Sequence, residues 1–128
     1  MPAKSVSEVI KTLAKHPEGL LGLFHRMGYV VLLPLLELPR KEVAENLKSS
    51  FRECGLNDAD CAGISLRDLI VFALTSKSDH WTGLAARWIA EGFPVDEAVI
   101  GAADEMIKTK QGTQSDRQML IRLIRKHS

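Results

Sequence analysis

The stretch DHWTGLAARWIAEGFP, residues 79–94, contains both tryptophans of the chain and decides how its second half folds. At 100° per residue, its bulky side chains fall on one side of a helix, within an arc of about 140°: Trp81, Leu84, Ala85, Trp88 and Ile89. The far side carries the small residues Gly83, Ala86 and Ala90, which let a neighbouring backbone approach closely. Such a helix packs between two layers, so the pattern predicts that Trp81 and Trp88 fill the core and do not form an exposed pair.

A narrow polar strip completes this helix and consists of His80, Arg87 and Glu91. Arg87 and Glu91 stand four residues apart, the spacing at which opposite charges pair along one helix face. In this segment the strip is the part most available to another molecule. We therefore predict that it forms part of a partner-binding surface.

Signals for helix starts recur on both sides of this segment. Each is a Ser or Asp just ahead of apolar residues at helical spacing: Ser5, Ser65, Ser78, Asp96 and Ser115. Ser5 with Glu8 and Ser115 with Gln118 also have the spacing of a capping box. The predicted connections are only about 2–7 residues long, so consecutive helices pack as antiparallel neighbours. The sequence predicts one all-α domain over residues 1–128, a compact antiparallel bundle of about six to seven helices.

Two segments of the first half have patterns of their own. Residues 18–27 predict a short helix that ends at Gly28. Its inward side chains are predicted to be Leu20, Leu21, Phe24 and Met27. Residues 29–38, YVVLLPLLEL, suit either a short strand or a buried helix broken at Pro34. We favour helix or irregular structure, because no second convincing strand exists to pair with it. The apolar run is eight residues long, whereas a bilayer span needs about 20, so no membrane partner is predicted.

Composition places the chain among ordinary soluble globular proteins, with 128 residues, 45% hydrophobic and 26% charged. The formal net charge of +1 gives no overall drive towards nucleic acid or acidic lipid. Residues 65–107 have three basic and seven acidic residues, a net charge of −4, and residues 108–128 have six basic and one acidic, a net charge of +5. This asymmetry indicates either a charged contact surface or neighbouring helices that satisfy one another.

The two charged regions supply two candidate surfaces. The acidic candidates for partner binding join Glu91 and are Asp96, Glu97, Asp104 and Glu105. The basic candidates share one side of an amphipathic C-terminal helix and are Arg122, Arg125 and Lys126. The basic side predicts contact with phosphate or an acidic partner. The alternative is a last helix whose cations favour the helix macrodipole and keep the surface soluble.

The sequence has no recognisable pattern for catalysis, a cofactor or a metal. No two of the four histidines have ligand spacing: His16, His25, His80 and His127. Cys54 and Cys61 are too few for a disulfide framework, and the acidic residues between them do not favour a thiolate. A calcium loop starting at Asp58 fails at its last position, where Leu69 stands in place of the bidentate Glu. We therefore predict that the protein is not an enzyme and binds no cofactor. Because the sequence has no signal-peptide pattern, we also predict that it is cytoplasmic.

The segment HWTGLAARWIAEGFPVDEAV, residues 80–99, has the pattern of a W-x2-LA-x2-W helix, a G-x-P-x-[DE] turn and the start of a further helix. Over residues 65–128 the layout resembles small bacterial helical-repeat proteins of the HEAT-like kind, some of which are similar to immunity proteins. The resemblance implies a short HEAT-like α-solenoid, a scaffold without catalytic residues that binds other proteins through an exposed helical surface. It transfers no individual functional residue.

These observations predict a non-catalytic protein–protein interaction module. The sharpest version is an inhibitor, immunity or adaptor protein that binds and masks a partner protein, with a basic partner suited to the acidic residues. The alternative is a helical protein that associates with nucleic acid through its basic C-terminal helix.

Overall fold

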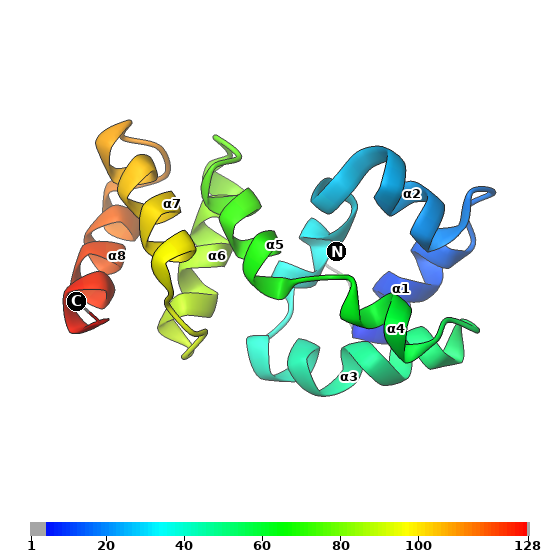
Figure 1. Cartoon of the computed structure of the whole chain (residues 1–128). Coiled ribbons are helices and arrows are strands. Elements are labelled where there is room, and N and C mark those ends of the chain that lie inside the picture. The colour runs from blue at the N-terminus through cyan, green and yellow to red at the C-terminus, as the bar shows by residue number, and fades with distance from the viewer. Residues whose placement is uncertain (1–4, 128) are drawn as a thin grey trace. The chain divides into compact units, whose positions relative to one another are not determined.

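The structure is a computed structural model that describes residues 5–127, with His127 described by its backbone alone. In this range it contains helices and no strand (Figure 1). The elements are α1 (Val6–Ala14), α2 (Gly19–Met27), the 3-10 helix η1 (Gly28–Glu37), α3 (Arg40–Glu53), α4 (Asp58–Ala62), α5 (Leu66–Leu74), α6 (Asp79–Ala90), α7 (Glu97–Lys108) and α8 (Gln114–His127). The prediction of an all-α helical bundle is confirmed.

The chain divides into two compact units, Met1–Leu66 and Arg67–Ser128. The first contains α1 to α4 with η1, and the second contains α5, except its first residue, through α8. Whether the two fold as the one domain expected from the sequence stays a prediction.

In the first unit, α1 packs against α3, α2 and η1, and α3 packs against α4. The apolar side chains of α1 recur at helical spacing, so that Val6, Val9 and Ile10 are buried together. Phe51 of α3 is fully buried. The helix α4 has no buried residue of its own and lies on the surface of the unit.

Residues 29–38, for which the sequence left strand and helix open, form most of η1. The 3-10 helix runs through Pro34 without a break, because the fixed φ of proline, about −65°, lies within the range of a 3-10 helix. Its buried side chains are Leu32, Leu33, Leu35 and Leu36. By length and composition alone, Gly19–Glu37 is long and apolar enough to cross a membrane. However, Gly28 (φ 72°, ψ −154°) turns the chain, so α2 and η1 are two elements and not one straight helix.

In the second unit, α6 packs against α8, and α8 packs against α7. Trp88 is fully buried, but Trp81 is only half-buried, with its ring edge-on to His80 at 4.6 Å. The prediction of two core tryptophans is therefore confirmed for Trp88, whereas Trp81 is neither fully buried nor exposed. The small side of α6 does receive its neighbour, because a Cβ at Gly83 would lie 3.0 Å from Asp116 Oδ2 of α8.

The caps decide where the helices begin. Ser5, Ser78 and Asp96 accept hydrogen bonds from the first-turn amides of α1, α6 and α7, as predicted. The capping box expected at Ser115 is wrong, because α8 already begins at Gln114. There the Asp116 amide donates to Thr113 Oγ1 at 3.1 Å.

Two further contacts fix the ends of short segments. The acids of the rejected calcium loop form a capping box, in which Asn57 and Asp60 exchange side-chain to amide hydrogen bonds of 2.8 and 3.0 Å. After α7, Arg117 Nη1 donates to the carbonyls of Lys110, Gln111 and Gly112. The guanidinium thereby holds the turn that leads into α8.

Candidate protein-binding surfaces

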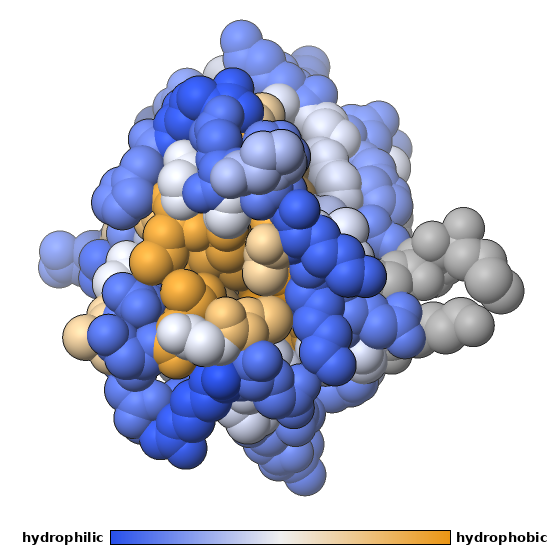
Figure 2. All heavy atoms as spheres, turned by 90° about the vertical axis from the view of Figure 1, so that its right-hand side faces the viewer, coloured by the Kyte–Doolittle hydropathy of each residue, from blue (hydrophilic) through white to orange (hydrophobic). Residues whose placement is uncertain are grey.

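The first unit has an apolar hollow between α2 and α4, with a volume of about 200 Å³. It is lined by Leu21, Phe24, His25, Ala59, Asp60, Gly63 and Ile64. Figure 2, which looks onto this unit, shows hydrophobic side chains exposed in a hollow with hydrophilic side chains around it. Exposed apolar patches with a polar rim are typical of interaction sites.

Two contacts hold the walls of the hollow in place. The Phe24 ring packs edge-on against Tyr29, with ring centroids 4.9 Å apart. Tyr29 Oη accepts a hydrogen bond of 2.9 Å from the Ser65 amide, directly after Ile64. Because one phenol ring contacts both walls, the hollow is preformed in the folded unit.

The wall made by α4 is also clamped to α3. Arg52 donates two hydrogen bonds to the Asp58 carboxylate, at 2.8 and 2.7 Å, and Lys48 lies 3.7 Å away. The hydrogen bond from Arg52 holds the pKa of Asp58 below its ordinary value of 3.8, against the opposing effect of desolvation. The short helix is thus fixed at its first turn, and its residue Ala59 lies exposed in the hollow.

The sequence predicted the lining of α2 as core. Leu20 is buried as expected, but Leu21 and Phe24 are half-buried in the hollow and Met27 is 48% exposed. The prediction of Met27 as inward is therefore wrong. The available signal was that GLLGLF is apolar on more than one side of the helix, whereas a single packing layer covers one side.

The predicted polar strip lies on α6. Arg87 Nε is 3.7 Å from Glu91 Oε2, the pair that the i, i+4 spacing indicated. His80 and Glu91 are exposed, and Arg87 is half-buried. The strip is therefore a paired surface in which Arg87 is held along the helix.

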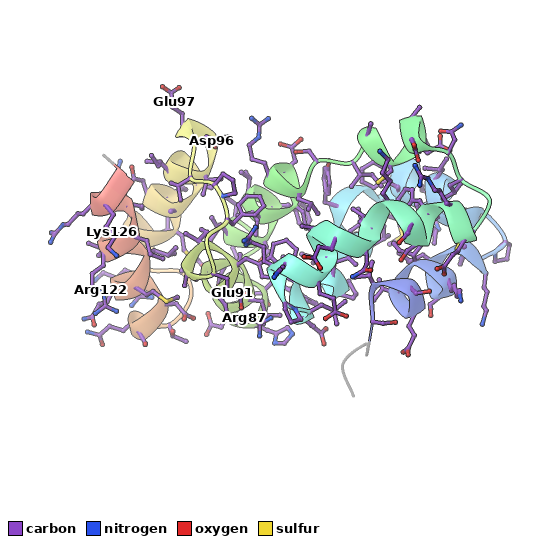
Figure 3. All side chains as sticks on the ribbon, turned by 90° about the horizontal axis from the view of Figure 1, so that it is seen from below. Arg87, Glu91, Asp96, Glu97, Arg122 and Lys126 are labelled. Carbon is purple, nitrogen blue, oxygen red and sulfur yellow. The ribbon has the colours of Figure 1, made fainter. Side chains whose placement is uncertain are left out.

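The other acidic candidates belong to α7, with Asp96 as its N-cap and Glu97, Asp104 and Glu105 within the helix. Figure 3 shows Asp96 and Glu97 at the start of α7, away from Arg87 and Glu91. The structure does not bring the two predicted groups together. We call the exposed carboxylates of α7 the acidic stripe: Glu97, Asp104 and Glu105.

Asp96, which precedes the acidic stripe, caps the start of α7. It accepts a hydrogen bond of 3.0 Å from the Val99 amide and lies 3.3 Å from Arg67 Nη1 at the start of α5. The bond from Val99, aided by Arg67, holds the pKa of Asp96 below its ordinary value of 3.8. Asp96 is thus engaged as the cap of α7 and contributes less to a partner surface than the sequence predicted.

The basic candidates share one exposed side of α8, which we call the basic stripe: Arg122, Arg125 and Lys126. Figure 3 shows Arg122 and Lys126 projecting outwards from that helix. Spacings of three and four residues make Arg125 and Lys126 both neighbours of Arg122 on this side of the helix. The stripe offers a row of cations to an anionic partner.

Two other hollows among the described residues have similar volumes. One of about 210 Å³ at the ends of α5 and α7 includes Lys77 and Glu105, and one of about 190 Å³ lies between α1 and α3. Among the described residues, no group of three His, Cys, Asp or Glu side chains is placed to hold a metal ion. Burial raises the pKa of the Cys61 thiol, which disfavours the nucleophilic thiolate.

No protein family, curated protein or solved structure matches the chain.

Proposed function

We propose that this protein is a non-catalytic interaction module that binds and masks a partner protein, as an inhibitor, immunity or adaptor protein. The observation that carries the proposal is the preformed apolar hollow between α2 and α4. Interfaces place most of their binding energy in a few anchor side chains that fill such hollows, surrounded by polar contacts that exclude water.

The size of the hollow favours a protein side chain over a small-molecule ligand. Its volume is about 200 Å³, whereas pockets for drug-sized ligands hold about 300–1,000 Å³. Leu21, Phe24 and Ile64 offer apolar contacts, and the Asp60 carboxylate is already engaged in the capping box of α4. The ligand chemistry that fits is one apolar side chain presented on a partner's surface.

The acidic stripe of α7 supports the same function as a second contact. Carboxylates arranged along one exposed helix suit a basic protein surface, and such charges mainly speed encounter and fix register. The resemblance of residues 65–128 to HEAT-like scaffolds agrees with binding through an exposed helical surface.

A substitution in the hollow tests the proposal. Ala59→Gln places a polar amide in the hollow without removing a core side chain, and Ala62→Gln is the matched control on the exposed end of the same helix. Affinity capture with wild-type bait identifies partners by mass spectrometry, and each partner is then titrated as a purified protein. We expect Ala59→Gln to weaken binding at least tenfold, about 1.4 kcal/mol. Equal affinity of the two variants would remove the hollow from the interface.

The basic stripe carries the second candidate function, association with nucleic acid. Three cations on one helix face release counterions when they meet phosphates, so binding should fall steeply as salt rises. Titration with duplex DNA and with RNA at two salt concentrations tests this. Salt-sensitive binding that is lost in Arg122→Glu with Lys126→Glu would support it, and absence of binding at low salt would rule it out.

A further inference from the structure

The exposed sides of α7 and α8 carry opposite charges on neighbouring helices. The two helices are consecutive, run antiparallel and pack against each other, joined by residues 109–113 (Figure 1). The acidic stripe lies on α7, and the basic stripe lies on α8 (Figure 3). One surface of the second unit therefore has an acidic half and a basic half.

Between the two stripes lies an apolar seam of four half-buried isoleucines: Ile100, Ile107, Ile121 and Ile124. Glu105, on one flank of α7, lines a hollow with Thr75 at the end of α5. Ile100 and Ile107 are on the opposite flank, away from α5. On α8, Ile121 and Ile124 share the flank of Arg117, which reaches the turn after α7. The seam thus follows the line where α7 meets α8.

Gly101 stands within the acidic stripe, between Glu97 and Asp104. It is exposed in the interior of α7, where glycine is a poor helix former. A Cβ built at Gly101 would meet no atom within 4 Å, so no described neighbour in this chain requires a glycine there. A second helix lying against α7 would explain it, since a missing side chain lets two backbones approach closely.

We propose that this surface binds a second copy of the same chain, as a dimer whose two-fold axis runs parallel to α7 and α8. A two-fold contact joins one surface patch to itself. Around this axis, α7 of each copy lies opposite α8 of the other, so both acidic stripes meet basic stripes. An in-plane axis perpendicular to the helices would place α7 against α7, acid against acid. The inference rests on the proposed function, which uses the acidic stripe as a second contact. It names a second copy of this chain as the partner of that stripe.

The register along the helices agrees with this arrangement. With a rise of about 1.5 Å per residue in both helices, and counting from the turn between them, Glu97 is level with Arg125 and Asp104 is level with Gln118. Arg122 lies between these two levels. Carboxylates of one copy therefore lie within reach of guanidinium groups of the other, and Lys108 at the end of α7 faces the neutral Gln114.

Sedimentation velocity on the full chain over a range of concentrations tests the proposal. We expect a concentration-dependent dimer at low salt that dissociates at high salt, because the charge pairs that flank the apolar seam are exposed and salt screens them. An acidic-stripe reversal, Glu97→Lys with Asp104→Lys, and a basic-stripe reversal, Arg122→Glu with Arg125→Glu, should each be monomeric. An equimolar mixture of the two variants should restore a dimer, since both of its contacts again join opposite charges.

Other results would overturn the proposal. A wild-type monomer at every concentration excludes self-association, and a dimer that survives both reversals places the contact on another face. Oligomers that grow beyond a dimer exclude the two-fold axis. Circular dichroism confirms that each variant is folded. Because Ala59→Gln tests the hollow separately, loss of this dimer and loss of the proposed function are distinguishable.

Discussion

Arg117 donates from Nη1 to the Gly112 carbonyl at 2.6 Å and ties the start of α8 to the turn that follows α7. The same nitrogen reaches the carbonyls of Lys110 and Gln111 at 3.1 Å. Backbone carbonyls at the end of a helix need partners, and a cation there also favours the macrodipole. The contact holds α7 and α8 in their antiparallel pairing.

Replacing Arg117 should loosen this turn. We expect Arg117→Met to destabilise the protein by about 1–3 kcal/mol, because charged hydrogen bonds to three carbonyls are lost. Arg117→Lys keeps the charge but not the planar geometry, so it should recover only part of the loss. Urea unfolding followed by circular dichroism measures both. Equal stability of Arg117→Met and the wild type would contradict a structural role for the contact.

Two glycines of the second unit should respond to alanine in opposite directions. Gly112 has φ +73°, and a Cβ there would lie 2.6 Å from Met106 Cε. Gly112→Ala should therefore destabilise the protein by about 1–2 kcal/mol or more. Gly101→Ala meets no atom within 4 Å and should stabilise α7 by about 0.5–1 kcal/mol. The midpoints of thermal unfolding, measured at a concentration where the protein is monomeric, give the direction of each change in stability. Shifts in the same direction would contradict the backbone conformations of these two glycines.

The two tryptophans should differ in their contribution to stability. Trp88→Ala removes a fully buried ring and should cost about 3–5 kcal/mol. Trp81 is half-buried, so Trp81→Ala should cost clearly less. Chemical denaturation of both variants compares them. Equal losses would mean that Trp81 is as deeply packed as Trp88.

Acid should weaken the second unit through Asp96. The pKa of Asp96 is held below its ordinary value of 3.8 in the folded protein by the Val99 amide and Arg67. Its charged form therefore stabilises the fold above the unfolded pKa, and this contribution is lost as the pH falls through the lower folded pKa. Asp96→Asn keeps the capping oxygen without the titration. Below pH 3.8 the stability of this variant should fall less steeply than that of the wild type. The midpoints of urea unfolding across the acid range measure both. Parallel curves would contradict a contribution of Asp96 to the pH dependence of stability.

The sequence was most informative where a local rule decides the structure. Asp96 and Ser78 were recognised as caps because a side-chain oxygen just before a helix accepts a hydrogen bond from an amide of its first turn. The deep burial of Trp88 followed from the two-sided pattern of α6. The start of α8 was placed wrongly because Thr113 and Ser115 both satisfy the local rule. In the structure, α8 starts at Gln114, with Thr113 as its cap and Arg117 bound to the carbonyls before it, and this arrangement depends on the position of α7.

The candidate surfaces were less accessible from the sequence. The hollow depends on which side of α2 has no neighbour, and Leu21 and Phe24 have the same apolar character as the buried Leu20 and Leu23. The charged residues were identified from the uneven charge distribution. Their division into separate surfaces on α6, α7 and α8 required the packing of the helices.

The construction of η1 has a consequence for how the first unit opens. Its four leucines form two ridges of eclipsed side chains, Leu32 with Leu35 and Leu33 with Leu36, and all four are buried. A 3-10 helix has weak hydrogen bonds of its own, so its amides depend on this burial. In hydrogen–deuterium exchange, the amide protons of η1 should exchange only when the whole unit opens, at a rate that follows global stability. These amides would then report the folding free energy of the first unit residue by residue.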